Sequence, residues 1–185
     1  MTVDEIYSQM AQTFQTETGL ALAGDGDMAV RLYTVAAQIY ALYVQADWVA
    51  RQCFPQTALG DYLDKHAQLR GLERRDAVAA VGVLRFSVPS APDTDLSIPA
   101  GTVCLTAAQV RFETLEAATL KAGNTYVDVR AQALEPGAAG NAAAGTIRAM
   151  AVAPVGVSQV TNPEAFTGGA DVEDDEALRE RVLET

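Results

Sequence analysis

Side chains that could support catalysis or bind a metal are few in this chain. His66 is the only histidine, and its apolar neighbours predict a structural imidazole, buried or half-buried on one face of a helix. A single histidine excludes metal sites that need two, and the sequence lacks the Gly-x-Ser-x-Gly motif of a nucleophile elbow. Cys53 and Cys104 are expected to be free thiols. We therefore predict no catalytic residue and no bound metal.

Residues 24–29 match the pattern Gly-x-Gly-x-x-Ala before a helix. Dinucleotide binding requires a buried strand before this motif, whereas residues 14–22 are short and polar. The carboxylates of Asp25 and Asp27 would also stand where a pyrophosphate must bind. We interpret the motif as the start of a helix capped by Asp25 or Asp27, and we expect no cofactor.

The acidic residues 173–176 are consecutive and lack the alternating spacing of a calcium-binding loop. Negative charge at the beginning of a helix explains them better, because it interacts favourably with the helix dipole. Paired carboxylates for glycoside hydrolysis depend on a separation in space, and the sequence singles out no such pair.

The overall charge and hydropathy exclude further classes of function. The net charge of −11 opposes binding to a phosphate backbone, although it favours a partner surface of basic character. No apolar run approaches the roughly 20 residues that cross a bilayer. The first five residues are acidic and do not resemble a signal peptide. We therefore predict neither nucleic-acid binding nor membrane insertion, and no small-molecule substrate.

Helical spacing dominates the first part of the chain. Residues 2–14 form one pattern, with Thr2 as N-cap and Glu5 in the capping-box position, and residues 58–72 form another. The longest pattern covers residues 28–49, and its apolar positions recur in a 4-3 spacing. These positions are Met28, Leu32, Val35, Ile39, Leu42, Ala46 and Val49.

Two interpretations of this long helix remain open. Its apolar stripe either packs on the flanking helices of a bundle, or includes an edge that contacts another subunit. Tyr40 and Tyr43, which widen the stripe, are the candidate residues for such a subunit contact.

Short β-branched runs with turn residues between them follow from Val81 onward. Strands are predicted over residues 81–88, 102–106, 110–115, 125–134, 145–150 and 155–160. In the run 125–134, Tyr126 and Asp128 should face one side, with Val127, Val129 and Ala131 on the other. The candidate structural turn residues are Pro99, Gly101, Gly140, Asn141, Gly145, Gly168 and Gly169.

These patterns predict an α+β fold with an N-terminal helical layer, an antiparallel β-rich module and the start of a further helix. The expected divisions are a helical region at residues 1–76, a β-rich module at 77–163, and an exit loop with a helix start at 164–185. The last pattern, from Asp171 to Val182, has no obvious packing partner after it. We expect it to begin a C-terminal region that is truncated here.

Several segments, taken in order, resemble the baseplate J-like family. They are residues 61–71, then Arg74 or Arg75, Ala80, Gly82 and Phe86, residues 98–102, 112–114, 137–141, 145–147 and 157–162, and residues 168–169 followed by 173–181. The family contains wedge proteins of contractile phage tails of the Mu type and of related tail-like particles. The resemblance covers most of the chain from about Asp61 onward. Family members typically continue well beyond the point where this chain ends.

The resemblance implies a non-enzymatic structural protein of the tail baseplate, located in the virion after assembly in the host cytoplasm. It implies contacts with other wedge and hub proteins, with self-association as a further possibility, and it carries over no catalytic residue. Two alternatives remain. A tail-associated hydrolase of cell-envelope polysaccharide would need two converging acids. A carbohydrate-binding β module would need exposed aromatic residues, for which Phe86, Phe112, Tyr126 and Phe166 are few.

Overall fold

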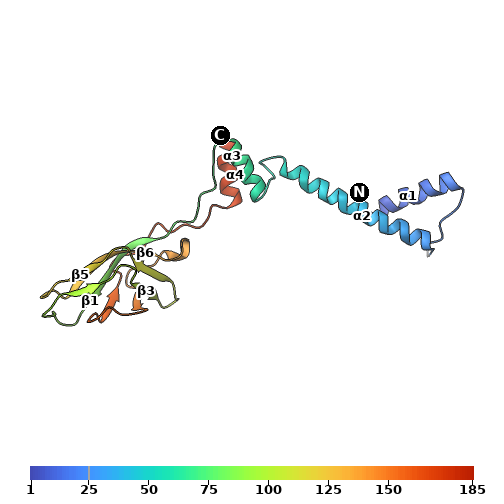
Figure 1. Cartoon of the computed structure of the whole chain (residues 1–185). Helices are drawn as coiled ribbons and strands as arrows, with labels where there is room; N and C mark the ends of the chain where they lie inside the picture. The colour runs from blue at the N-terminus through green and yellow to red at the C-terminus, as the bar shows by residue number, and fades with distance from the viewer. Residues whose placement is uncertain (25) are drawn as a thin grey trace. The chain divides into compact units, whose positions relative to one another are not determined.

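The computed structural model describes residues 1–24 and 26–185. The chain forms two compact units (Figure 1). The helical unit contains residues 1–73 and 175–185, and the β unit contains residues 74–174. The predicted α+β class is confirmed. The division into residues 1–76, 77–163 and 164–185 stays a prediction.

The helical unit begins with a pair of helices, α1 (Val3–Thr18) and α2 (Asp27–Gln52). Thr2 caps α1 as predicted: its hydroxyl accepts from the Glu5 amide at 3.2 Å, and the Glu5 carboxylate accepts from the Thr2 amide at 2.8 Å. The predicted cap of α2 by Asp27 is wrong, because Gly26 is the N-cap and Asp27 is the first helical residue. Asp25, the other predicted cap, lies outside the described residues.

Two shorter helices complete this unit, α3 (Asp61–Leu69) and α4 (Asp175–Glu184). The last helix has no packing partner after it in the sequence, but it has one before it. Leu178 and Val182 of α4 are fully buried together with Ala58, Leu63 and Ala67, so α4 packs against α3 (Figure 1). Sequence patterns did not suggest this pairing because more than a hundred residues separate α3 from α4 (Leu69 to Asp175).

The β unit is an antiparallel sheet that nearly closes on itself. The strands occur in the order β7-β3-β4-β6-β1-β8, with β2 and β5 forming a separate pair. Their bounds are β1 Val81–Ser87, β2 Leu96–Ile98, β3 Val103–Thr106, β4 Arg111–Thr114, β5 Ala118–Leu120, β6 Tyr126–Ala133, β7 Ile147–Met150 and β8 Gln159–Thr161. A short 3₁₀ turn, η1, spans Ala138–Gly140.

The core of this unit lies inside the curved sheet. In β6 the predicted alternation is confirmed, because Val129 and Ala131 are buried while Tyr126 and Asp128 are exposed. The rings of Phe112 and Phe166 meet edge to face with their centroids 4.7 Å apart, which is a favourable aromatic geometry. The other large core side chains are Leu84, Phe86, Ile98, Leu120, Ile147 and Val160.

The two end strands of the sheet, β7 and β8, lie beside each other but are not paired as a ladder. The side chain of Asn162, which is fully buried, joins them instead. Its carbonyl oxygen accepts from the Ile147 amide at 3.0 Å, and its amide nitrogen donates to the carbonyls of Ala143 and Glu164 at 2.8 and 2.9 Å. The backbone carbonyl of Asn162 also accepts from the Gly145 amide at 2.8 Å. A side chain therefore provides the closure that a strand pair would otherwise supply.

None of the helices in the described residues is both long and apolar enough to cross a membrane.

Replacing Asn162 with Ala should destabilise the β unit by about 2–3 kcal/mol, because buried donors and acceptors would lose their partners. Urea unfolding monitored by β-sheet circular dichroism measures the change. Asn124→Ala is the matched control, since Asn124 is exposed, and it should change the free energy by no more than about 0.5 kcal/mol. Equal midpoints for the two variants would contradict the role assigned to Asn162.

Candidate functional site

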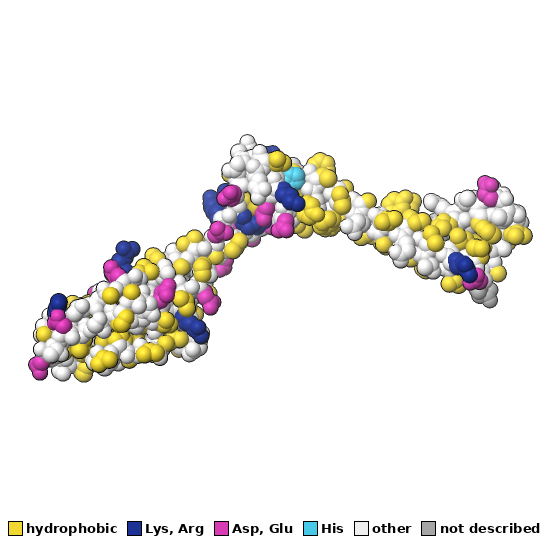
Figure 2. All heavy atoms as spheres, viewed as in Figure 1, with side chains coloured by type: hydrophobic (Ala, Val, Ile, Leu, Met, Phe, Trp, Pro, Cys, Tyr) yellow, Lys and Arg dark blue, Asp and Glu magenta, His cyan; other side chains and the backbone are white. Residues whose placement is uncertain are grey.

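Most of the exposed large apolar side chains of the helical unit lie on α2. Of its 26 residues, only Ala29, Ala36 and Gln52 are buried. Large apolar side chains remain in water along its length, and yellow atoms gather over this helix in Figure 2. We call these residues the hairpin surface: Met28, Val30, Tyr33, Val35, Tyr40, Leu42, Tyr43, Val44, Trp48 and Val49.

The positions of the 4-3 spacing are themselves largely uncovered. Leu42 is 69% exposed, Val35 47% and Val49 48%. Helix α1 covers only one side of α2, where Ala29 and Ala36 are buried and where Tyr7 meets Tyr33 with ring centroids 5.6 Å apart. A groove of about 540 Å³ remains between the two helices. Its apolar lining includes Ile6, Met10 and Phe14 of α1 and Leu32, Ile39 and Tyr43 of α2.

The hairpin surface also lacks charge. Residues 32–46 contain no Asp, Glu, Lys or Arg. The charged residues of α2 lie near its two ends and pair within the helix, Asp27 with Arg31 at 2.8 Å and Asp47 with Arg51 at 2.9 Å. An exposed helix normally carries charge on its solvent face, and one that is apolar on most sides is normally buried. This surface is therefore suited to being covered.

The structure places both predicted contact residues on the hairpin surface. Tyr43 is 51% exposed and lines the groove, and Tyr40 is 37% exposed. Sequence reasoning singled out these tyrosines but not Leu42, which is more exposed than either. The 4-3 spacing includes Leu42 in the apolar stripe, but it does not indicate whether other helices bury the stripe.

In the β unit, Pro99 and Gly101 form the turn between β2 and β3. The Pro99 carbonyl accepts from the hydroxyls of Thr102 and Thr114, at 2.7 and 2.9 Å. Gly101 has φ +75° and its amide donates to the Thr114 carbonyl at 2.8 Å. A Cβ at Gly101 would meet no atom within 4 Å, so the backbone conformation alone favours glycine there.

Of the predicted turn residues, Gly140 and Gly169 lie close to Ala80, and Asn141 is hydrogen-bonded to Gly169. A Cβ on Gly140 would lie 3.3 Å from the Ala80 Cβ, and one on Gly169 would lie 3.1 Å from it. The Asn141 side chain binds the Gly169 backbone twice, donating to its carbonyl at 2.8 Å and accepting from its amide at 2.9 Å. Close neighbours, rather than a left-handed conformation, restrict these two glycines: a Cβ on Gly140 would lie 2.8 Å from the Ala133 Cβ, and one on Gly169 would lie 2.6 Å from the Gly137 carbonyl oxygen. Gly145 and Gly168 occupy turns with φ +72° and +84°.

The residues with reactive side chains have structural surroundings. As predicted, His66 is half-buried, and its Nε2 donates to the Gln52 carbonyl at 2.8 Å. Burial raises the pKa of the Cys104 thiol to about 12, which keeps it protonated. Within residues 1–24 and 26–185, His, Cys, Asp and Glu form no group of three that could hold a metal ion.

The aromatic residues of the β unit bear on the carbohydrate-binding alternative. Phe86, Phe112 and Phe166 are buried in the core. Tyr126 is 51% exposed, but the guanidinium of Arg85 lies over its ring at 4.2 Å. Arg85 also makes two 2.7 Å hydrogen bonds to Asp128, which hold the pKa of that carboxyl below its usual range. Of the aromatic residues considered for sugar binding, only Tyr126 reaches the outer face.

Comparison with known proteins identifies the β unit. Residues 83–169 match the family described as the Baseplate J-like protein barrel domain. These residues form a baseplate J-like barrel domain. The resemblance inferred from the sequence is therefore confirmed.

Two curated relatives extend the match beyond the baseplate J-like barrel domain. The Mu-like prophage FluMu protein gp47 of Haemophilus influenzae is 34% identical over 142 residues, 76% of this chain and 38% of the relative. Baseplate protein gp47 of Escherichia phage Mu is 33% identical over 153 residues, 81% of this chain and 41% of the relative. The chain thus spans about two fifths of these relatives, 38% and 41%.

The fold also occurs in a solved assembly. A chain in the cryo-EM structure of the anti-feeding prophage baseplate aligns with 96% of this chain and 50% of its own length, with a TM-score of 0.52. At 12% sequence identity the likeness concerns the fold.

Replacing Gly101 with Val should destabilise the β unit by about 1–3 kcal/mol, because a β-branched residue is strained at positive φ. The surrounding space is open, so the change in unfolding free energy isolates the backbone cost. Urea unfolding measures it. Ala100→Val, at the adjacent exposed residue, is the control and should be nearly neutral. Equal effects of the two substitutions would show that positive φ is not the source of the cost.

Proposed function

We propose that this chain is a structural component of the baseplate wedge in a contractile phage tail or a related tail-like particle. It acts by protein–protein contacts and is located in the virion baseplate after assembly in the host cytoplasm. The baseplate J-like barrel domain and the names of the relatives, baseplate protein gp47 of phage Mu among them, support this proposal.

The observation that carries the proposal is the uncharged, exposed hairpin surface. Charged residues are common elsewhere in the chain, whose net charge is −11, yet residues 32–46 of α2 contain none. Keeping Leu42 and Val35 in water is unfavourable, by about 25 cal/mol for each Å² of apolar area. Contiguous exposed apolar patches of this kind are typical of protein interfaces.

The spacing of the surface favours a helix as the covering element. Positions repeating in a 4-3 pattern pack as knobs into holes of a facing helix. The partners we propose are other wedge and hub proteins of the baseplate, with Tyr40 and Tyr43 in the contact. Self-association through the same surface is the second candidate, since the uncharged centre of α2 would bring no like charges together.

We propose no enzymatic activity and no small-molecule substrate. The groove between α1 and α2 and the cleft between Pro99 and Pro154 are lined without a carboxylate. The hydrolase alternative requires two converging acids in a cleft, and these surfaces do not provide them. The proposal also includes no binding of nucleic acid and no insertion into a membrane.

Replacing both Tyr40 and Tyr43 with Glu should abolish assembly, because two carboxylates would be buried in an apolar contact. The test co-expresses the chain with the other baseplate proteins of the same tail gene cluster and follows the complex by size-exclusion chromatography and sedimentation velocity. We expect loss of the complex and an unchanged helical circular dichroism spectrum.

Gln45→Glu is the matched control, because it adds a carboxylate to the same helix at an exposed polar position. It should leave the complex intact. If the double tyrosine variant assembles as well as this control, the proposed contact is wrong. Sedimentation of the purified chain alone separates self-association from binding to a different protein.

A further inference from the structure

The β unit is inserted into the helical unit. The chain leaves the helical unit after Glu73 and returns to it at Asp175. Helices α3 and α4, which pack together, thus lie on opposite sides of the insertion in sequence. An unfolded insertion of this length would oppose their pairing, because the entropy cost of closing a loop grows with its length.

The folded β unit removes this separation. Its first and last segments are joined by antiparallel bridges, in which the Val78 amide donates to the Ala170 carbonyl at 2.8 Å and the Ala170 amide donates to the Val78 carbonyl at 3.0 Å. Further along the same two segments, the Glu173 amide donates to the Arg75 carbonyl at 3.0 Å, and the Glu173 carboxylate accepts from the Arg75 amide at 3.0 Å. The two points where the insertion begins and ends are therefore already side by side.

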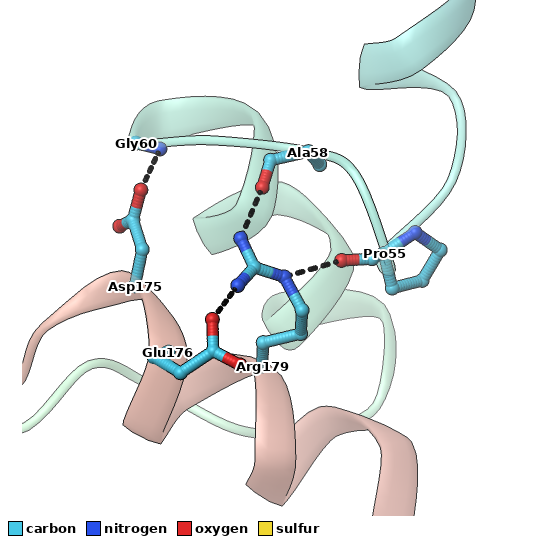
Figure 3. Close-up of polar contacts among 6 residues, drawn as sticks. All are labelled: Pro55, Ala58, Gly60, Asp175, Glu176 and Arg179. Carbon is cyan, nitrogen blue, oxygen red and sulfur yellow. Dashed lines mark hydrogen bonds and ion pairs between the residues drawn. The ribbon is translucent and has the colours of Figure 1, made fainter.

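Helix α4 then fixes the segment that links α2 to α3 (Figure 3). The Arg179 side chain, 13% exposed, donates to the carbonyls of Pro55 and Ala58 at 3.2 and 2.9 Å and pairs with Glu176. The Asp175 carboxylate accepts from the Gly60 amide at 2.9 Å. These contacts hold both sides of the 55–60 turn against α4.

Without α4, little would hold α3 in place. It has nine residues, and its buried side chains, Leu63 and Ala67, pack with Leu178 and Val182. Helices this short are marginal without tertiary packing. The end of α2 depends in turn on α3 and on the segment before it. The side-chain oxygen of the buried Gln52 accepts from the Leu59 amide at 2.9 Å, and its backbone carbonyl accepts from His66 of α3 at 2.8 Å.

We infer that α4 is a latch that orders α3 and the adjoining end of α2 only after the β unit has folded. Arg179 is a positioning residue of this latch. As a result, one end of the hairpin surface is ordered only when the barrel domain has folded. The inference concerns order within the chain and does not require the proposed assembly role to be correct.

Trp48 provides a local reporter, since it is the only tryptophan and its ring lies edge-on to Tyr62 of α3 at 5.2 Å. Amide hydrogen exchange reports each element separately. In the full chain, Leu178→Asp should speed exchange of the α3 amides by about tenfold or more and shift the Trp48 emission to the red. The β6 amides should stay protected, because their core does not include α4.

The converse variant is Phe112→Asp, which buries a charge beside Phe166 and should unfold the β unit. We expect α3 to lose its protection in this variant although α3 and α4 are unaltered. The latch would be overturned if, in Phe112→Asp, the α3 amides exchanged at the wild-type rate while the β6 amides had lost protection. Loss of β6 protection in Leu178→Asp would overturn it too. A urea titration of the wild-type chain gives the same comparison, since α3 must not outlast β6.

A milder pair of variants tests the positioning residue. Arg179→Ala should accelerate α3 exchange and shift Trp48 emission in the same direction as Leu178→Asp. Its neighbour Glu180 is exposed, so Glu180→Ala should match the wild type in both measurements. Equal behaviour of these two variants would remove Arg179 from the latch.

Discussion

The structure of the β unit depends on how closely three backbone segments approach one another at Ala80. Gly140 and Gly169 lie on two of these segments, and a Cβ on Gly169 would come within 2.6 Å of the Gly137 carbonyl oxygen. Contacts this short are not available to any larger residue. The last part of the β unit lies alongside the first, where Val78 bridges to Ala170 and Val81 to Thr167.

The two units are stabilised in different ways. The β unit encloses a continuous apolar core with Phe86, Phe112 and Phe166 at its centre, whereas the small core between α3 and α4 contains Ala58, Leu63, Ala67, Leu178 and Val182. The α1–α2 pair has still less, since Ile6, Ala29 and Ala36 are its buried apolar residues. A pair of helices with so little buried area gains little stability on its own. Its apolar side chains stabilise a contact only when another surface covers them.

The sequence predicts local structure here better than long-range pairing. The capping box at Thr2, the alternation in β6 and the left-handed turn at Gly101 follow from short-range sterics and hydrogen bonding, which a few neighbouring residues determine. β2 and β5, each three residues long, are too short to show periodicity. The packing of α4 on α3 was missed because periodicity identifies an apolar face but not its partner.

The same limit applies to the candidate site. Tyr40 and Tyr43 were chosen because they widen the stripe of α2, and Asn162 was missed because a single asparagine before a proline is typical of any turn. A signal for Asn162 did exist: it directly follows a strand that ends the sheet, where unpaired backbone groups need a partner. The exposure of Leu42 could not be inferred from its apolar side chain, since buried and exposed positions of an apolar stripe carry the same residue types.

The hairpin surface is uncharged itself but has acidic residues beside it on α1. The first basic side chain in the chain is Arg31, so α1 carries Asp4, Glu5 and Glu17 without a compensating Lys or Arg. The acidic α1 thus flanks an uncharged groove. Long-range attraction would come from these acidic residues, whereas the apolar groove would supply contact area after encounter. A partner helix with basic residues near its ends and apolar residues between them would match both parts. A second copy would match only the apolar part, because its own α1 repeats the acidic charge.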